Sequence, residues 1–144
     1  MTAIQFVLGY IWLVAGLEKV WSADFVNNFS KTLQFFASKN PLTWYVQLVN
    51  SWILLNPTLW ARLIQWSEVG VGLVLMLGCS GLLYNVWQKN KYWRGLLALA
   101  WLASALMNLN FYFAAGWTGP SSAGLNMLMF WVEMIFIYGL LTEL

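Results

Sequence analysis

Four long apolar stretches, separated by more polar connections, dominate the pattern of this chain. Each is long enough for a helix of about 20 residues, the length that crosses about 30 Å of hydrocarbon. We predict membrane spans at residues 2–21, 59–81, 92–113 and 123–141. Four helices of this kind pack as one small bundle, so residues 1–144 are predicted to form a single domain of an all-α integral membrane protein.

The connection between the first and second spans, residues 22–57, has a pattern of its own. After Asp24, a residue type that suits a helix N-cap, apolar side chains recur at helical spacing and polar side chains oppose them. A second helical stretch follows Pro41, and it is too short to span a bilayer. We predict two short interfacial helices that cover the outer end of the bundle, either as simple packing or as a lid over a site.

Composition supports the membrane assignment and narrows the chemistry. Of 144 residues, 61% are apolar and 8% are charged, which is typical of a protein in contact with membrane lipid. The chain has no histidine and one cysteine, Cys79, so we expect it to ligate no metal or haem. A net charge of +2, dispersed along the sequence, gives no indication of nucleic-acid binding.

The connection Gln88-Lys89-Asn90-Lys91, with Arg94 just beyond it, is the short loop richest in positive charge. The positive-inside rule therefore places it in the cytoplasm, together with both termini. Residues 22–57 and 116–122 then face the opposite side, which in a bacterium is the periplasm. The predicted location is an inner (cytoplasmic) or other energy-transducing membrane.

Two glutamates, Glu68 and Glu133, fall near the middle of predicted spans. A carboxylate at that depth is costly unless it is paired, hydrated or protonated, so each one is a candidate functional residue. With the predicted topology, most polar side chains of the spans lie in the outer half of the membrane. We predict that they form one cluster: Glu18, Lys19, Arg62, Gln65, Glu68, Ser104, Asn108, Asn110, Asn126 and Glu133.

Helical spacing constrains how Glu68 can be paired. Gln65, Glu68 and Gly72 share one helix face, whereas Arg62 lies six residues away and well round the helix. Glu68 therefore needs a partner on another helix, and the cheapest electrostatic arrangement pairs Lys19 or Arg62 with a glutamate across the bundle. An alternative interpretation remains open, in which both glutamates are hydrogen-bonded polar contacts that hold helices together.

Several short motifs occur along the chain: Leu8-Gly9, Ala15-Gly16-Leu17-Glu18-Lys19, Trp66-Ser67-Glu68-Val69-Gly70-Val71-Gly72, Met107-Asn108-Leu109-Asn110-Phe111, Ala115-Gly116 and Asn126-Met127-Leu128-Met129-Phe130-Trp131-Val132-Glu133. Together they resemble the DoxX/DoxD family, whose members include the DoxD-type small subunit of thiosulfate:quinone oxidoreductase. The resemblance implies a four-helix membrane protein and, for some members, quinone-linked oxidation of sulfur compounds.

Carried over residue by residue, the resemblance implies a site with two kinds of residue. A quinone site needs an apolar slot, aromatic walls and groups that exchange protons as electrons arrive. We assign catalytic roles to Glu68, Glu133 and Glu18. Substrate binding is assigned to three amides and two cations. Lys19 belongs to the matching motifs, and Arg62, which lies outside them, is added because both cations suit a small oxyanion such as thiosulfate. These residues are Lys19, Arg62, Asn108, Asn110 and Asn126.

Three functional hypotheses follow. The first is a membrane subunit of a quinone-linked oxidoreductase that oxidises thiosulfate, with quinone as bound ligand and a partner subunit supplying the redox centre that this sequence lacks. The alternative is a non-catalytic accessory subunit of a larger respiratory or photosynthetic complex. The third, a proton-conducting bundle, is the weakest because the inner half offers no continuing polar path.

Overall fold

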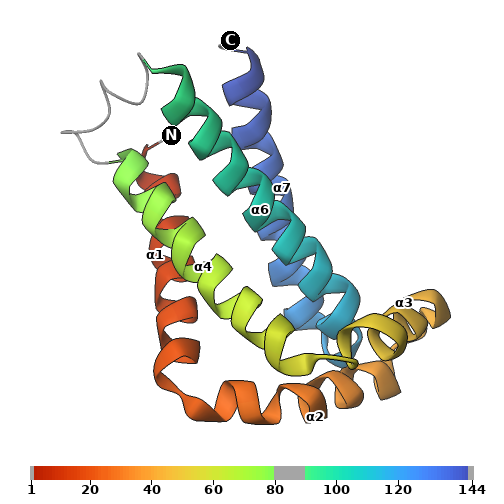
Figure 1. The fold of residues 1–144 in the computed structure, drawn as a ribbon. Coiled ribbons are helices and arrows are strands. Elements are labelled where there is room, and N and C mark those ends of the chain that lie inside the picture. The colour runs from red at the N-terminus through yellow and green to blue at the C-terminus, as the bar shows by residue number, and fades with distance from the viewer. Residues whose placement is uncertain (1, 80–89, 143–144) are drawn as a thin grey trace.

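The computed structural model describes residues 2–79 and 90–142, and within them the chain is helical without strands (Figure 1). Four helices are long and apolar enough to cross a membrane: α1 (Thr2–Trp21), α4 (Pro57–Cys79), α6 (Lys91–Ala115) and α7 (Pro120–Thr142). The predicted four-helix membrane bundle is confirmed, and the protein is a multi-pass membrane protein. The second span was predicted to reach residue 81, and its last two residues lie outside the described part.

Helices α4 and α6 begin where the local sequence offers a cap. The side chain of Asn90 accepts a hydrogen bond from the backbone N–H of Tyr92 at 2.9 Å, and Asn56 accepts one from Leu59 at 3.2 Å. Helix α4 begins with Pro57, whose fixed backbone angle and missing N–H suit the first position of a helix. These signals explain why the second span starts two residues before its predicted boundary.

The connection between α1 and α4 forms the two predicted short helices. Helix α2 (Ala23–Lys39) buries Phe29 and Leu33, which lie one turn apart on the same face. Helix α3 (Thr43–Leu48) continues into a π-helical turn, η1 (Val49–Ile53). In Figure 1, α2 runs across the ends of the long helices and α3 lies beside it, at the end opposite the chain termini. We call this the capped end of the bundle.

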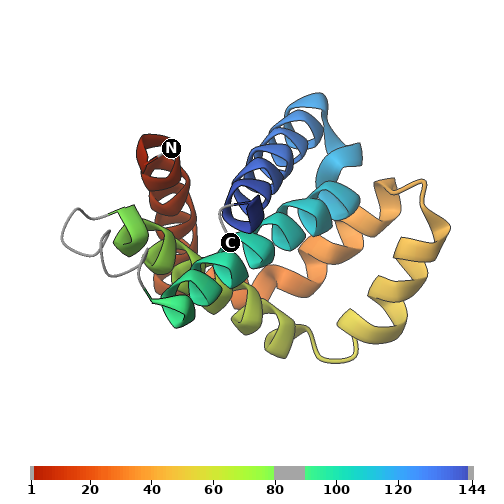
Figure 2. The same ribbon diagram turned by 90° about the horizontal axis from the view of Figure 1, so that it is seen from above.

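The four long helices follow the spatial order α1, α4, α6, α7, and each packs against the next (Figure 2). The start of α1, the end of α4, the start of α6 and the end of α7 lie together at the end opposite the capped end (Figure 1). This arrangement agrees with the predicted topology. The side of the membrane that each end faces stays a prediction, and Gln88 and Lys89 lie outside the described residues.

Glycines bring α1 and α4 into close antiparallel contact. A Cβ atom added at Gly16 would lie 2.6 Å from the backbone nitrogen of Val69, and one added at Gly9 would lie 2.9 Å from that of Met76. On the opposite helix, Gly72 packs against the backbone of Leu13. Small residues at such a contact allow two membrane helices to approach closely. Lys19, one turn beyond Gly16, is thereby held against α4.

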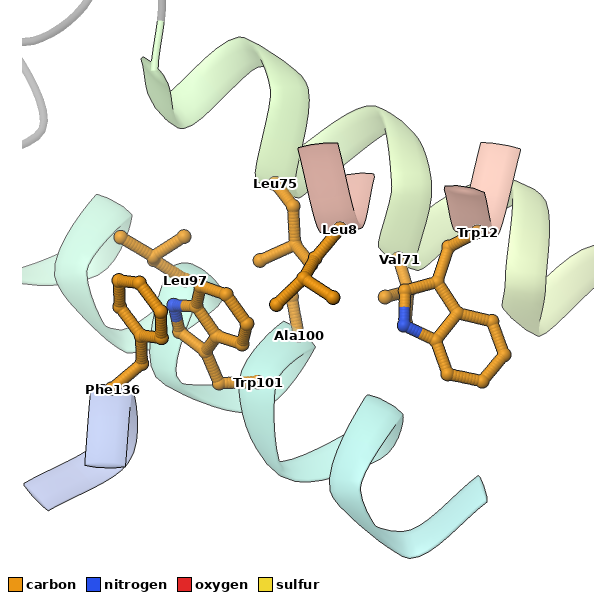
Figure 3. Packing of buried hydrophobic residues seen from close by; sticks show 8 residues of the cluster. All are labelled: Leu8, Trp12, Val71, Leu75, Leu97, Ala100, Trp101 and Phe136. Carbon is orange, nitrogen blue, oxygen red and sulfur yellow. The ribbon is translucent and has the colours of Figure 1, made fainter. Parts of the chain in front are cut away.

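Two apolar clusters fix the bundle and its cap. Between the long helices, Trp101 of α6 stacks on Phe136 of α7, with ring centroids 4.4 Å apart (Figure 3). At the capped end, a second buried cluster joins α2, α3 and η1 to α4 and α6. Its members are Phe29, Leu33, Tyr45, Val49, Ala61 and Ala114. Helices α2 and α3 and the η1 turn are therefore packed onto the long helices and form the capped end of the bundle.

Candidate functional site

The first polar group joins α1 to α4. Lys19 Nζ donates to Glu68 Oε2 at 2.6 Å, which confirms the prediction that the partner of Glu68 lies on another helix. This is one of the cation–glutamate pairs that the sequence allowed. Glu68 is fully buried, whereas 26% of the Lys19 side chain remains exposed. The Lys19 ammonium also lies 3.4 Å from the carbonyl oxygen of Ala15 and 5.6 Å from the ring centroid of Phe25. A cation in the last turn of α1 is further stabilised by the helix dipole.

The expected shared face of α4 is present at this pair. Gln65, Glu68 and Gly72 are all buried, and the last two contact α1. Two buried acceptors in this layer, Gln65 Oε1 and Glu68 Oε1, make no hydrogen bond to any residue in the described part of the chain. Burying an acceptor atom without a donor is energetically unfavourable. The layer around the Lys19–Glu68 pair therefore contains two oxygen atoms that can still accept a hydrogen bond.

The second polar group surrounds Glu133 and joins three helices. Asn108 Nδ2 of α6 lies 2.9 Å from both carboxylate oxygens of Glu133, and Trp12 Nε1 of α1 donates to Oε1 at 3.2 Å. Glu133 is fully buried and forms no salt bridge with a described residue. Its partners are uncharged hydrogen-bond donors, so its environment differs in kind from that of Glu68.

Sequence reasoning missed the role of Trp12. It lies in an unbroken apolar run, where an indole is expected to serve packing, and its ring does pack beside Val71 (Figure 3). The N–H of a buried indole nevertheless usually finds an acceptor. Because α1 and α7 are not neighbours in the order of helices, only the tertiary arrangement identifies Glu133 as that acceptor.

The third group lines a cavity of about 1090 Å³ at the capped end. Its walls come from α2, α3, η1, α4, α6 and α7, with Lys19 at the end of α1. The polar side chains on its walls include Asn110 and Asn126, both predicted as substrate-binding residues. The aromatic side chains on its walls are Phe25, Phe29, Phe36, Trp44, Tyr45, Trp52, Trp60 and Phe111.

Tyr45 ties the cap to the bundle at this cavity. Its hydroxyl donates to Asn110 Oδ1 at 2.8 Å, and burial raises the pKa of Tyr45 to about 12, so the phenol is neutral at ordinary pH. The rings of Trp44 and Phe113 pack edge to face, with their centroids 5.4 Å apart. Tyr45 belongs to the short helical stretch predicted after Pro41, and the sequence gave no sign of its contact with α6.

The predicted single cluster is thus divided into separate groups. One further member, Ser104, donates to the carbonyl oxygen of Trp101 in its own helix, at 2.9 Å. Two members, Glu18 and Arg62, lie outside these groups. Glu18 and Arg62 are exposed, do not line the cavity and form no salt bridge with another described residue. Neither Glu68 nor Glu133 lines the cavity. Asn126 donates to the carbonyl oxygen of Ser122 in its own helix, at 2.8 Å. The functional roles assigned to these residues stay predictions.

Within residues 2–79 and 90–142 there is no group of three or more histidine, cysteine, aspartate or glutamate side chains that could hold a metal ion. No protein-family model, curated protein or solved structure matches this chain. The resemblance of its motifs to the DoxX/DoxD family therefore stays a prediction.

Proposed function

We propose that this chain is the membrane subunit of a quinone-linked oxidoreductase and that quinone binds in the capped-end cavity. The cavity carries the proposal. Its volume of about 1090 Å³ is slightly above the usual range for small-molecule pockets, roughly 300–1,000 Å³. It has room for a quinone ring and the first part of an apolar tail.

The walls have the chemistry that a quinone requires. Aromatic rings offer stacking and edge contacts to a flat ring, and Lys19 offers a hydrogen-bond donor to a carbonyl oxygen. At the rim, Trp52 and Leu125 are 72% and 60% exposed, so the cavity is open to its surroundings. In a membrane, this opening lets a lipid-soluble ligand enter from the side.

The electron donor belongs to a partner in this proposal. The DoxX/DoxD resemblance points to thiosulfate as the reductant, and a partner subunit carries the redox centre that passes its electrons to quinone. With both termini in the cytoplasm, as the loop charge predicts, the cavity faces the outer side of an energy-transducing membrane. The chain then contributes the quinone site and the membrane anchor of the complex.

A matched pair of leucines on α7 tests the quinone site. Leu125 lines the cavity, whereas Leu128, three residues later and similarly exposed, does not. Leu125→Trp adds a bulky ring to the cavity wall, and Leu128→Trp adds the same ring outside it. In a complex purified with its native partners, we expect Leu125→Trp to raise the KM for a soluble quinone analogue about tenfold or more, with thiosulfate as reductant.

Leu128→Trp should leave the same KM within about twofold of the wild-type value. Equal kinetics for the two variants would contradict a quinone site in this cavity. A purified complex that contains the chain but does not reduce quinone with thiosulfate would contradict the proposed reaction.

The alternative function, a non-catalytic accessory subunit, is favoured by one feature of α7. Only Glu133 and Phe136 of this helix are buried, and its exposed apolar residues recur along its length as a surface for lipid or for another subunit. These residues are Leu125, Leu128, Trp131, Ile135, Tyr138 and Leu141. Two results together would support this alternative. The chain co-purifies with a larger complex in fixed stoichiometry, and that complex turns over normally when the Leu125→Trp variant replaces the wild-type chain.

A further inference from the structure

The capped-end cavity is close to electrically neutral. Among the described residues that line it, Lys19 is the only one with a charged side chain. Its ammonium lies 2.6 Å from a carboxylate oxygen of Glu68, which sits behind the wall and does not line the cavity. The positive charge of Lys19 is therefore already balanced by the carboxylate of Glu68 when the cavity holds no ligand.

Lys19 still has hydrogen-bonding capacity on the cavity side. An ammonium group has three N–H donors, and the contacts with Glu68 and the Ala15 carbonyl account for two of them. Asn110 also lines the cavity, and its amide nitrogen makes no hydrogen bond to another residue in the described part. The walls thus offer donors without an uncompensated charge.

An anion and an uncharged acceptor meet very different conditions in such a cavity. An anion that leaves water for apolar walls loses hydration that only a strong counter-charge can replace. A carbonyl oxygen needs only a hydrogen-bond donor in place of water. The other cation predicted to hold an oxyanion, Arg62, is exposed and lies outside the cavity walls.

We infer that the Lys19–Glu68 ion pair makes this cavity select uncharged, carbonyl-bearing ring ligands and reject anions. It follows that a sulfur oxyanion binds elsewhere, on the partner that carries the redox centre. This inference rests on the proposed quinone site and adds its charge selectivity. Glu68 is a positioning residue in this inference, because its carboxylate balances the charge of Lys19 without touching the ligand.

Two quinone probes of different charge test the inference on the purified chain in nanodiscs. Menadione is uncharged, and lawsone, a hydroxynaphthoquinone, is an anion at neutral pH. Binding is measured by quenching of tryptophan fluorescence, since Trp44, Trp52 and Trp60 line the cavity. We expect the wild-type chain to bind menadione about tenfold more tightly than lawsone, and thiosulfate not to displace menadione.

Glu68→Gln gives the sharpest comparison. It removes the counter-charge and leaves Lys19 cationic, so the affinity for lawsone should rise about tenfold or more while the affinity for menadione changes little. The double variant Lys19→Met with Glu68→Leu keeps the cavity neutral, so it should not gain affinity for lawsone. Lys31→Gln, which changes an exposed cation of α2 outside the cavity, should alter neither affinity.

A wild-type chain that binds lawsone as tightly as menadione would overturn the inference even if no variant folds. So would a folded Glu68→Gln chain with an unchanged ratio of the two affinities. Either result leaves the proposed quinone site intact, because menadione still binds. If the folded wild-type chain binds neither quinone, both the proposed site and the inference fail.

Discussion

Glu68 and Glu133 are both fully buried in membrane-spanning helices, yet their surroundings differ in kind. Glu68 is held by the charge of Lys19 at an interface of two helices, beside a cavity. Glu133 is held by the uncharged donors Asn108 and Trp12 at a junction of three helices. Two carboxylates that are equally buried in this bundle therefore have different electrostatic environments. What distinguishes the two is the partner, and whether that partner reaches a cavity.

The two arrangements also differ in what they contribute to stability. In a low-dielectric region, the attraction between the two charges of an ion pair offsets the free-energy cost of burying them. Removing one partner leaves the other charge buried and unpaired, so its burial cost is no longer offset. Hydrogen bonds between membrane helices contribute less, on average about 0.6 kcal/mol each. We therefore expect the Lys19–Glu68 contact to be the more sensitive of the two to the loss of one partner.

The largest effect is expected from Lys19→Met. This change leaves Glu68 buried with no cation near it and should lower the free energy of unfolding by about 3–5 kcal/mol. Unfolding in mixed detergent micelles, followed by far-ultraviolet circular dichroism, measures the loss. Met keeps most of the length of the lysine side chain, so the change tests the charge more than the packing.

The double variant Lys19→Met with Glu68→Leu removes both charges and should recover most of that loss. Arg62→Met removes an exposed cation and should change stability by less than about 0.5 kcal/mol. If Lys19→Met proves as mild as Arg62→Met, the ion pair contributes little and the contrast between the two glutamates disappears.

The next largest effect is expected from Glu133→Leu. The donors of Asn108 and Trp12 then lose their acceptor in a buried site, and we expect a loss of about 2–4 kcal/mol. Glu133→Gln is the matched control because its side chain retains one acceptor oxygen and nearly the same shape. It should cost less than half as much in the same unfolding measurement, and an equal cost would indicate that the negative charge itself is needed.

A smaller effect is expected at the close contact that places Lys19 against α4. Gly72→Ala adds a methyl group against the backbone of Leu13, and α1 must shift, at a cost of about 1–3 kcal/mol. Gly70→Ala, two residues away on the same helix, meets no atom within 4 Å and should be neutral or slightly stabilising. Equal melting temperatures for the two variants would contradict the tight α1–α4 interface.

The sequence predicted the features that depend on one helix at a time. The four spans follow from hydropathy, and the shared face of Gln65, Glu68 and Gly72 follows from helical spacing. The exclusion of Arg62 as an intrahelical partner follows from the same geometry. The pairing of Lys19 with Glu68 was one of a few options that charge alone allowed.

The features that the sequence did not predict depend on the order of the helices in space. Helix α1 takes part in both polar groups: Lys19 in its last turn pairs with Glu68 of α4, whereas Trp12, about two turns earlier, donates to Glu133 of α7. The pair and the junction are therefore separate groups rather than one cluster. The cavity likewise depends on how α2 and α3 fold back over the bundle. No periodicity within a span carries that information, since the spans are apolar on nearly every side.

The smallest effect, and the most specific one, is expected at Trp12. Trp12→Phe keeps an aromatic ring in the apolar core and removes the N–H that donates to Glu133 at 3.2 Å. Asn108 still donates to both carboxylate oxygens, so the loss should be close to the value of one interhelical hydrogen bond, about 0.6 kcal/mol, plus a small packing term. In the Glu133→Leu background the acceptor is already gone, and Trp12→Phe should then cost less or even stabilise the protein. A double-mutant cycle over these two positions therefore isolates the contact between α1 and α7. A coupling energy of zero would mean that the indole serves packing alone, as its place in an apolar run suggests.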